Sequence, residues 1–269
     1  MESYIFYILI LIITGAGIGF LSGLLGVGGG FIMVPIQFWL LTSMGVDPTV
    51  AIRISLGTSL AVILPTAISG AYGHYRKNAV LIKPTAFLAV TGMMGGILGG
   101  IIATNISGDV LQIIFGLAAL IVAFKMLVMK YPEINEKPID KTIYYIFGGL
   151  FVGIMSGLLG VGGGFIVVPF MVILMRYDIH KAIGTSTAVI VFTSIGGIIS
   201  YIFNGWGMQG LPQYSLGYVN LLQLVLLAGA SIPMAQIGVK TAHKLSSRKL
   251  NYIFVGLMIL IGLKMIGVI

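Results

Sequence analysis

The stretch GFLSGLLGVGGGFIMVP at residues 19–35 returns almost unchanged as GIMSGLLGVGGGFIVVP at residues 153–169. Fourteen of the 17 positions are identical, at an offset of 134 residues. Two further matches follow in the same order: GTSLAVIL at 57–64 with GTSTAVIV at 184–191, and IFGLAALIVAFKML at 114–127 with IFVGLMILIGLKMI at 253–266. Three collinear matches indicate a duplicated unit. We predict a first repeat at 1–130, a linker at 131–141 and a second repeat at 142–269.

The composition places these repeats in lipid. Hydrophobic residues make up 58% of the 269-residue chain and charged residues 8%, whereas a soluble domain has roughly 25% charged residues. Six apolar stretches have the length of one membrane span, about 20 residues. Two longer ones, 4–42 and 142–175, carry a glycine cluster inside. The sequence therefore predicts an all-α polytopic membrane protein. We expect it in a prokaryotic cell (inner) membrane.

The basic residues predict how the chain crosses the membrane. Of 15 Lys and Arg residues, 13 fall in the connections 73–84, 125–141, 176–181 and 240–250, while 43–52, 105–109 and 204–217 hold none. The positive-inside rule puts the first set in the cytoplasm. Corresponding connections of the two repeats then lie on opposite sides. We therefore expect two inverted-topology repeats, each with a re-entrant helical hairpin broken by glycine and three transmembrane helices, and a cytoplasmic linker between them.

The glycine clusters are the predicted substrate site. Irregular backbone at membrane depth is tolerated where it is buried or lines a cavity, and a helix that begins there directs N–H groups and its positive dipole end at the break. Two breaks entering from opposite sides are expected to meet near the midplane and bind an anion. The predicted substrate-binding residues are Gly28, Gly29, Gly30, Gln37, Arg53, Thr58, Ser59, Gly162, Gly163, Gly164, Thr185 and Ser186.

Other kinds of site are not expected. The chain has no cysteine, so thiolate metal sites and Cys nucleophiles are excluded. Its seven acidic residues fall in loops or termini, and its three histidines have no metal-ligand spacing. We predict no enzymatic activity, no catalytic or metal-binding residues, no cofactor and no nucleic-acid partner. His74 is interpreted as a solvated loop residue, and the absence of carboxylates from the spans favours an anionic substrate.

The doubled motif resembles the sulfite exporter TauE/SafE family. The residues that carry the resemblance are 23–35 with 57–62 and 157–169 with 184–189. It implies transport of sulfite, a sulfonate or a related organic anion, and coupling to protons or to the membrane potential. We expect a secondary transporter whose halves rock around the anion by alternating access, with a small anion, protons and membrane lipid as partners. The alternatives are a passive anion channel, a membrane enzyme and a non-transporting subunit. The sequence does not decide whether the protein forms a homo-oligomer.

Overall fold

The structure is a computed structural model that describes residues 2–25, 28–128, 138–241 and 247–268. It is nearly all helical, with one two-stranded hairpin. The elements are α1 Glu2–Leu25, α2 Gly30–Ser43, α3 Pro48–Tyr75, α4 Ile82–Asn105, α5 Gly108–Val128, α6 Thr142–Leu159, α7 Gly164–Pro169, the π-helical turn η1 Phe170–Leu174, α8 Ile179–Asn204, β1 Ser215–Leu216, β2 Val219–Asn220, α9 Leu221–Thr241 and α10 Ser247–Met265. The hairpin β1–β2 was not expected from the sequence.

Among the described residues, seven helices are long and apolar enough to cross a membrane: α1, α3, α4, α5, α6, α8 and α9. The segments that follow the glycine breaks are shorter. The first, α2, has 14 residues, and the second runs from Gly164 to Leu174 through α7 and η1. At 1.5 Å per residue, α2 is roughly 21 Å long, which is less than the roughly 30 Å of a hydrocarbon core. These lengths fit a polytopic membrane protein.

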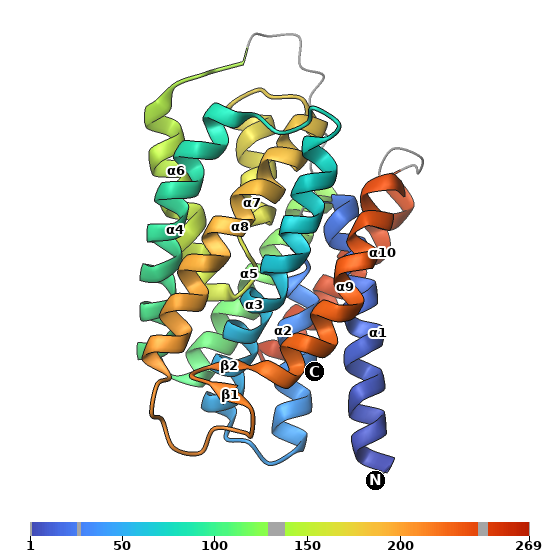
Figure 1. Ribbon diagram of the computed structural model, residues 1–269, viewed down its shortest axis with the longest axis vertical. Coiled ribbons are helices and arrows are strands. Elements are labelled where there is room, and N and C mark those ends of the chain that lie inside the picture. The colour runs from blue at the N-terminus through green and yellow to red at the C-terminus, as the bar shows by residue number, and fades with distance from the viewer. Residues whose placement is uncertain (1, 26–27, 129–137, 242–246, 269) are drawn as a thin grey trace.

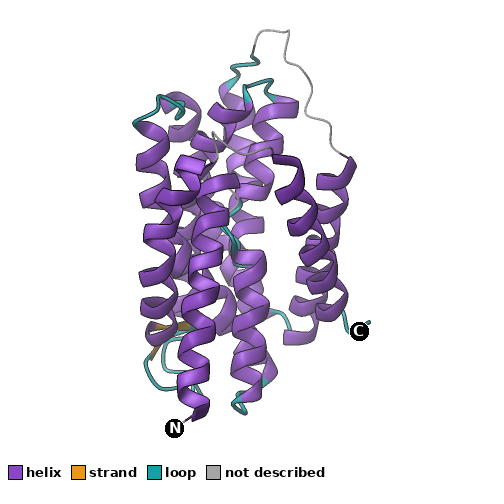
Figure 2. Cartoon of the chain, turned by 90° about the vertical axis from the view of Figure 1, so that its right-hand side faces the viewer, coloured by secondary structure: helices purple, strands orange, loops and turns teal. Residues whose placement is uncertain are grey.

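The helices stand side by side, and their connections gather at two ends (Figures 1 and 2). The connections 76–81, 138–141 and 175–178 lie at the upper end of Figure 1, which we call the basic end. The connections 44–47, 106–107 and 205–220 lie at the lower end, which we call the far end. The α1–α2 segment starts and finishes at the far end, whereas α6 starts and η1 finishes at the basic end.

Glycine seams join helices from different repeats. On α1, methyl groups at Gly15, Gly19 and Gly23 would clash with the backbone of Leu227, Ser231 and Ala235 on α9. On α6, Gly153 and Gly157 meet the backbone of α4 in the same way. Small residues let transmembrane backbones approach closely and gain dispersion energy. The two repeats are therefore interlocked, with α1 held by α9 and α4 held by α6.

The central helices α3 and α8 pack against each other between these pairs. Each starts at an aspartate: Asp47 accepts hydrogen bonds from the backbone N–H groups of Thr49 and Val50, and Asp178 accepts them from His180 and Lys181. Such caps satisfy N–H groups that have no partner within the helix. Because Asp47 caps α3, the helix begins before Arg53, which lies in its second turn and not at its start.

Candidate functional site

Both glycine breaks use backbone conformations that suit glycine. Gly28 and Gly29 have φ angles of 82° and 73°, and Gly162 and Gly163 both have 82°. A side chain at such a φ angle is strained. Gly29 and Gly163 are the residues immediately before α2 and α7. Each break therefore ends in a helix start, where the first N–H groups have no partner within the helix.

The two breaks lie against each other. A methyl group at Gly30 would be 2.6 Å from Cα of Val161 and 2.7 Å from the carbonyl oxygen of Gly160, and one at Gly28 would be 2.7 Å from the carbonyl oxygen of Val161. The backbones of the two repeats are thus in direct contact, with no room for a further carbon atom between them at these points. The structure brings together the two glycine clusters that the sequence singled out.

Two isoleucines flank this contact. Positions Gly28 and Gly162 both face the side chains of Ile63 on α3 and Ile190 on α8. Ile63 and Ile190 are equivalent at the 127-residue offset, and both are almost fully buried. The pair closes the sides of the contact with apolar surface. Sequence reasoning passed over both residues, because an isoleucine in a membrane helix carries no signal that separates it from lipid-facing neighbours.

Buried hydroxyl groups fasten the breaks to the central helices. Ser59 donates to the carbonyl oxygen of Gly160 at 2.7 Å, and its equivalent Ser186 donates to that of Gly164 at 3.5 Å. Thr193, which the sequence analysis did not select, donates to the carbonyl oxygen of Gly162 at 2.8 Å. The bonds to Gly160 and Gly162 satisfy carbonyl groups of the irregular backbone between α6 and α7.

Thr58 and Thr185 have a different place. The Thr58 hydroxyl accepts a hydrogen bond of 2.8 Å from the backbone N–H of Asn220, directly before α9. The Thr185 hydroxyl accepts one of 3.0 Å from the backbone N–H of Leu81, directly before α4. Thr58 of the first repeat therefore holds the start of α9 in the second repeat. Thr185 of the second repeat holds the start of α4 in the first. The hydroxyl oxygens of Thr58 and Thr185 therefore serve the fold.

Gln37 is the most unusual of the predicted residues. Its side chain on α2 is 0% exposed. Within the described residues, neither Oε1 nor Nε2 of this amide has a hydrogen-bond partner. A buried polar atom without a partner is destabilising by about 1–3 kcal/mol, and native structures contain few of them. Seven residues separate Gln37 from Gly30, which is roughly two helical turns or 10 Å toward the far end.

Arg53 is half-buried, nearer the far end than the glycine contact. Its guanidinium donates to the carbonyl oxygen of Ile106 at 2.9 Å and to the hydroxyl of Tyr218 at 3.3 Å, and it lies 5.8 Å from the centre of the Tyr218 ring. All these partners are neutral. No acidic side chain within the described ranges pairs with Arg53, which leaves its positive charge without a protein counter-ion.

Near the basic end, the burial of His74 differs from the prediction, and an ion pair was not predicted. His74 is 3% exposed in the last turn of α3, so its interpretation as a solvated loop residue was wrong: the helix continues farther than the apolar stretch suggested. Lys83 forms an ion pair of 2.9 Å with Asp140, and the Tyr145 hydroxyl donates to Asp140 at 3.2 Å. The hydrogen bond from Lys83 lowers the pKa of Asp140 below its usual value.

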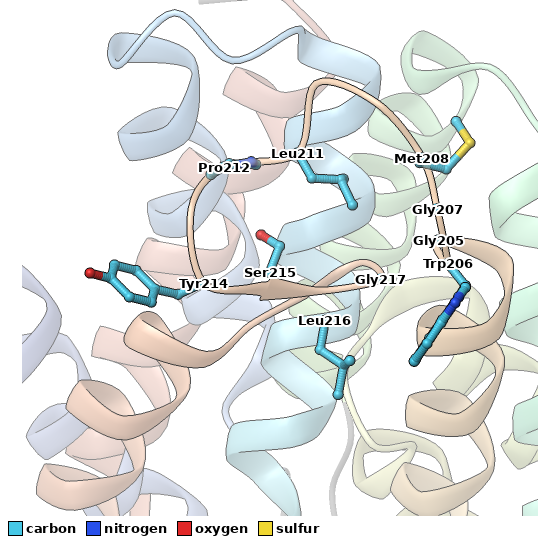
Figure 3. Close-up of a pocket in the computed structure, with 10 residues that line it drawn as sticks. All are labelled: Gly205, Trp206, Gly207, Met208, Leu211, Pro212, Tyr214, Ser215, Leu216 and Gly217. Carbon is cyan, nitrogen blue, oxygen red and sulfur yellow. The ribbon is translucent and has the colours of Figure 1, made fainter.

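A separate pocket of about 360 Å³ lies at the far end, under the loop between α8 and β1. Figure 3 shows its lining, which comes from one loop and includes Trp206, Leu211, Tyr214 and Leu216. None of the predicted site residues lines it. In the described part of the chain, no group of three or more His, Asp or Glu side chains is placed to hold a metal ion.

Comparison with known proteins gives consistent matches over almost the whole chain. The model of the sulfite exporter TauE/SafE family matches residues 11–265. A probable membrane transporter protein of Haemophilus influenzae is 30% identical, covering 96% of this chain and 98% of the relative. One of Methanocaldococcus jannaschii is 28% identical, covering 96% and 94%, and one of Bacillus subtilis is 26% identical, covering 96% of each. No solved structure matches the chain.

Proposed function

Because this chain belongs to the sulfite exporter TauE/SafE family of membrane transporters, we propose that it carries sulfite, a sulfonate or a related small organic anion by alternating access. The observation that carries the proposal is the contact between Gly30 and the Gly160–Val161 backbone. This contact joins the start of α2 to the break that precedes α7, and the first N–H groups and the positive dipole end of a helix favour an anion. Such a point attracts an anion without an intramembrane cation.

The inverted repeat at 1–130 and 142–269 is supported by equivalent hydrogen bonds. Thr58 and Thr185, 127 residues apart, each accept from the residue before a seam helix. The N–H of Tyr218 donates to the carbonyl oxygen of Tyr201, as the N–H of Ala79 does to that of His74. The opposite ends at which the two hairpins start and finish agree with inversion (Figure 1). The positive-inside rule then assigns the basic end to the cytoplasm.

The interlocked seams refine the expected motion. Since α1 is held by α9 and α4 by α6, the two halves of the sequence do not form two separate bodies that rock as units. We propose that the α1–α9 and α4–α6 pairs move in turn against the central α3–α8 pair. Each movement would withdraw Ile63 or Ile190 from the glycine contact and open it to one side of the membrane.

Arg53 fits a recruiting role at the entrance on the far end. Its charge is held by neutral partners, the Ile106 carbonyl and the Tyr218 hydroxyl, so no carboxylate of the described residues neutralises the charge. A half-buried charge is less screened by salt than one in open solvent. We propose that Arg53 raises the local anion concentration and that the hydroxyls and N–H groups deeper in the protein bind the substrate.

Uptake of labelled sulfite and of labelled methanesulfonate into proteoliposomes tests the proposal, with and without a pH gradient. A secondary transporter gives saturable flux that the gradient accelerates if protons are coupled. Flux that rises linearly with concentration, together with single-channel currents in a planar bilayer, would favour the passive channel instead. Absence of flux for both anions, from protein that is monodisperse and folded, would overturn the proposed substrate class.

A further inference from the structure

A second buried glutamine has an open amide atom. Gln223 on α9 is 0% exposed, and its Nε2 donates to the Tyr7 hydroxyl on α1 at 2.8 Å. Its Oε1 has no hydrogen-bond partner among the described residues. A 180° rotation of a glutamine amide exchanges oxygen and nitrogen, so Gln223 can present either a donor or an acceptor to a third group. Gln37 can present both.

The two amides lie at nearly the same height in the bundle. A methyl group at Gly29 would clash with the side chain of Ile18, and one at Gly15 with the backbone of Leu227, which aligns α2 and α9 with α1. Gln37 lies eight residues from Gly29 toward the far end, level with position 10 of α1. Gln223 lies four residues from Leu227 in the same direction, level with position 11. The difference is about 1.5 Å along the helix axes.

They also face the same space. Met33 and Leu40 flank Gln37 by one turn on either side, and both pack in the apolar cluster that contains Tyr7 and Leu227. Residues three and four apart share a helix face, so Gln37 borders this cluster on one side, while Val34 and Leu41 on its other side pack with α3 and α5. Leu227 stands in the same relation to Gln223. Figure 1 shows α1, α2, α3 and α9 around this cluster: α1 contacts α2, α3 and α9, and α3 contacts α2 and α9.

We propose that Gln37 and Gln223 form a second anion-binding station, between the far end and the glycine contact. This proposal rests on the proposed transport function, and it specifies which class of anion the protein binds. A fully deprotonated oxyanion offers acceptors alone and would leave the carbonyl group of Gln37 unpaired. An oxyanion that keeps one hydroxyl, such as hydrogen sulfite, accepts from an amide N–H and donates to an amide carbonyl. The station therefore selects a monoprotonated oxyanion.

The station belongs to one side of the protein. At the 134-residue offset of the glycine motif, Gln37 corresponds to Met171, which is buried in an apolar cluster on η1. No equivalent amide therefore lies on the path toward the basic end at this position. Both glutamines are fully buried, so the anion reaches them when the α1–α9 pair moves away from α2 and α3. An asymmetric station holds the anion more strongly on the far-end side.

Gln37→Met tests the station with a side chain that the second repeat already uses at the equivalent place. Removing a buried amide that lacks a protein partner should raise the melting temperature, by about 2 °C or more. Losing a substrate hydrogen bond should at the same time raise the KM for sulfite about tenfold. A merely structural role predicts the opposite sign for stability. Gln223→Met should raise the KM in the same way, without the gain in stability, because it also removes the bond to Tyr7.

Gln236→Met is the matched control, since Gln236 lies on α9 with Gln223 and its Nε2 donates to the carbonyl oxygen and the hydroxyl of Ser69. It should leave the KM unchanged. Methanesulfonate, which has no hydroxyl, should show a smaller rise in KM than sulfite in Gln37→Met. Wild-type KM values in both station variants would overturn the station while the transport function stands. Equal rises for both anions would overturn the selection of a protonated oxyanion, and absence of sulfite flux in the wild type would overturn function and station together.

Discussion

The Ser59 hydroxyl reaches across 101 residues of sequence to donate a 2.7 Å hydrogen bond to the carbonyl oxygen of Gly160. The hydroxyl oxygen of Ser59 would itself lie 3.1 Å from a methyl group at Gly30. One buried side chain on α3 thus touches the start of α2 and the break that precedes α7. It ties the two glycine breaks to a central helix.

Ser59→Ala should loosen this junction. The substitution leaves the Gly160 carbonyl buried without its partner, which is expected to lower the free energy of unfolding by about 1–3 kcal/mol. Thermal unfolding in detergent measures the change as a lower melting temperature. Ser43→Ala is the control, because Ser43 is exposed and its hydroxyl bonds back to Leu40 of its own helix. Equal melting temperatures for the two variants would contradict a structural role of the Ser59 bond.

Gly30→Ala should separate the two breaks. Its φ angle suits alanine, but the new methyl group would lie 2.6 Å from Cα of Val161, and backbone cannot move aside as a side chain does. We expect transport to fall at least tenfold (about 1.4 kcal/mol in the barrier), measured as initial uptake per folded protein. Gly17→Ala, on α1 with nothing within 4 Å of the new methyl group, should transport normally. Wild-type uptake by Gly30→Ala would remove the glycine contact from the proposed mechanism.

Arg53→Gln should weaken anion capture from the far end. The variant loses the charge but can keep a hydrogen bond to the Ile106 carbonyl, so we expect a KM about tenfold higher with a smaller change in maximal rate. Arg53→Lys keeps the charge and loses the planar guanidinium group, so its KM should lie between those of the wild type and Arg53→Gln. Uptake measured at low and high salt should show that salt weakens the wild type more than the glutamine variant. A KM insensitive to both substitutions would leave Arg53 a purely structural role.

Asp140→Asn should lower the melting temperature at neutral pH and leave it unchanged in acid. The Lys83 contact lowers the pKa of Asp140 below 3.8, so the stability that this carboxylate contributes is present above that value and is lost as the pH falls through the lowered pKa. At neutral pH the melting temperature of the wild type should therefore exceed that of the asparagine variant, and the difference should not depend on pH there. That margin should vanish in the acid range below 3.8. A margin that persists there would mean that the ion pair is not its source.

The fold was predictable where the sequence repeats itself. Glycine clusters of near-identical sequence within over-long apolar stretches marked both breaks, because so many small residues in a membrane segment do not favour continuous helix. Partners remote in sequence were not predictable. Thr58 accepts a hydrogen bond from the N–H of Asn220, and Thr185 accepts one from that of Leu81. No local sequence pattern predicts such pairs. The same holds for His74, whose burial depends on how far α3 extends.

The opposed glycine seam between α1 and α9 has a consequence for biogenesis. Gly15 meets Leu227, so α1 finds this packing partner after 212 more residues have been made. Until then the bare glycine stripe of α1 faces lipid or transient neighbours. Assembly of this protein is thus completed from its C-terminal part, and a nascent chain that stops before α9 exposes a surface that membrane quality control can recognise.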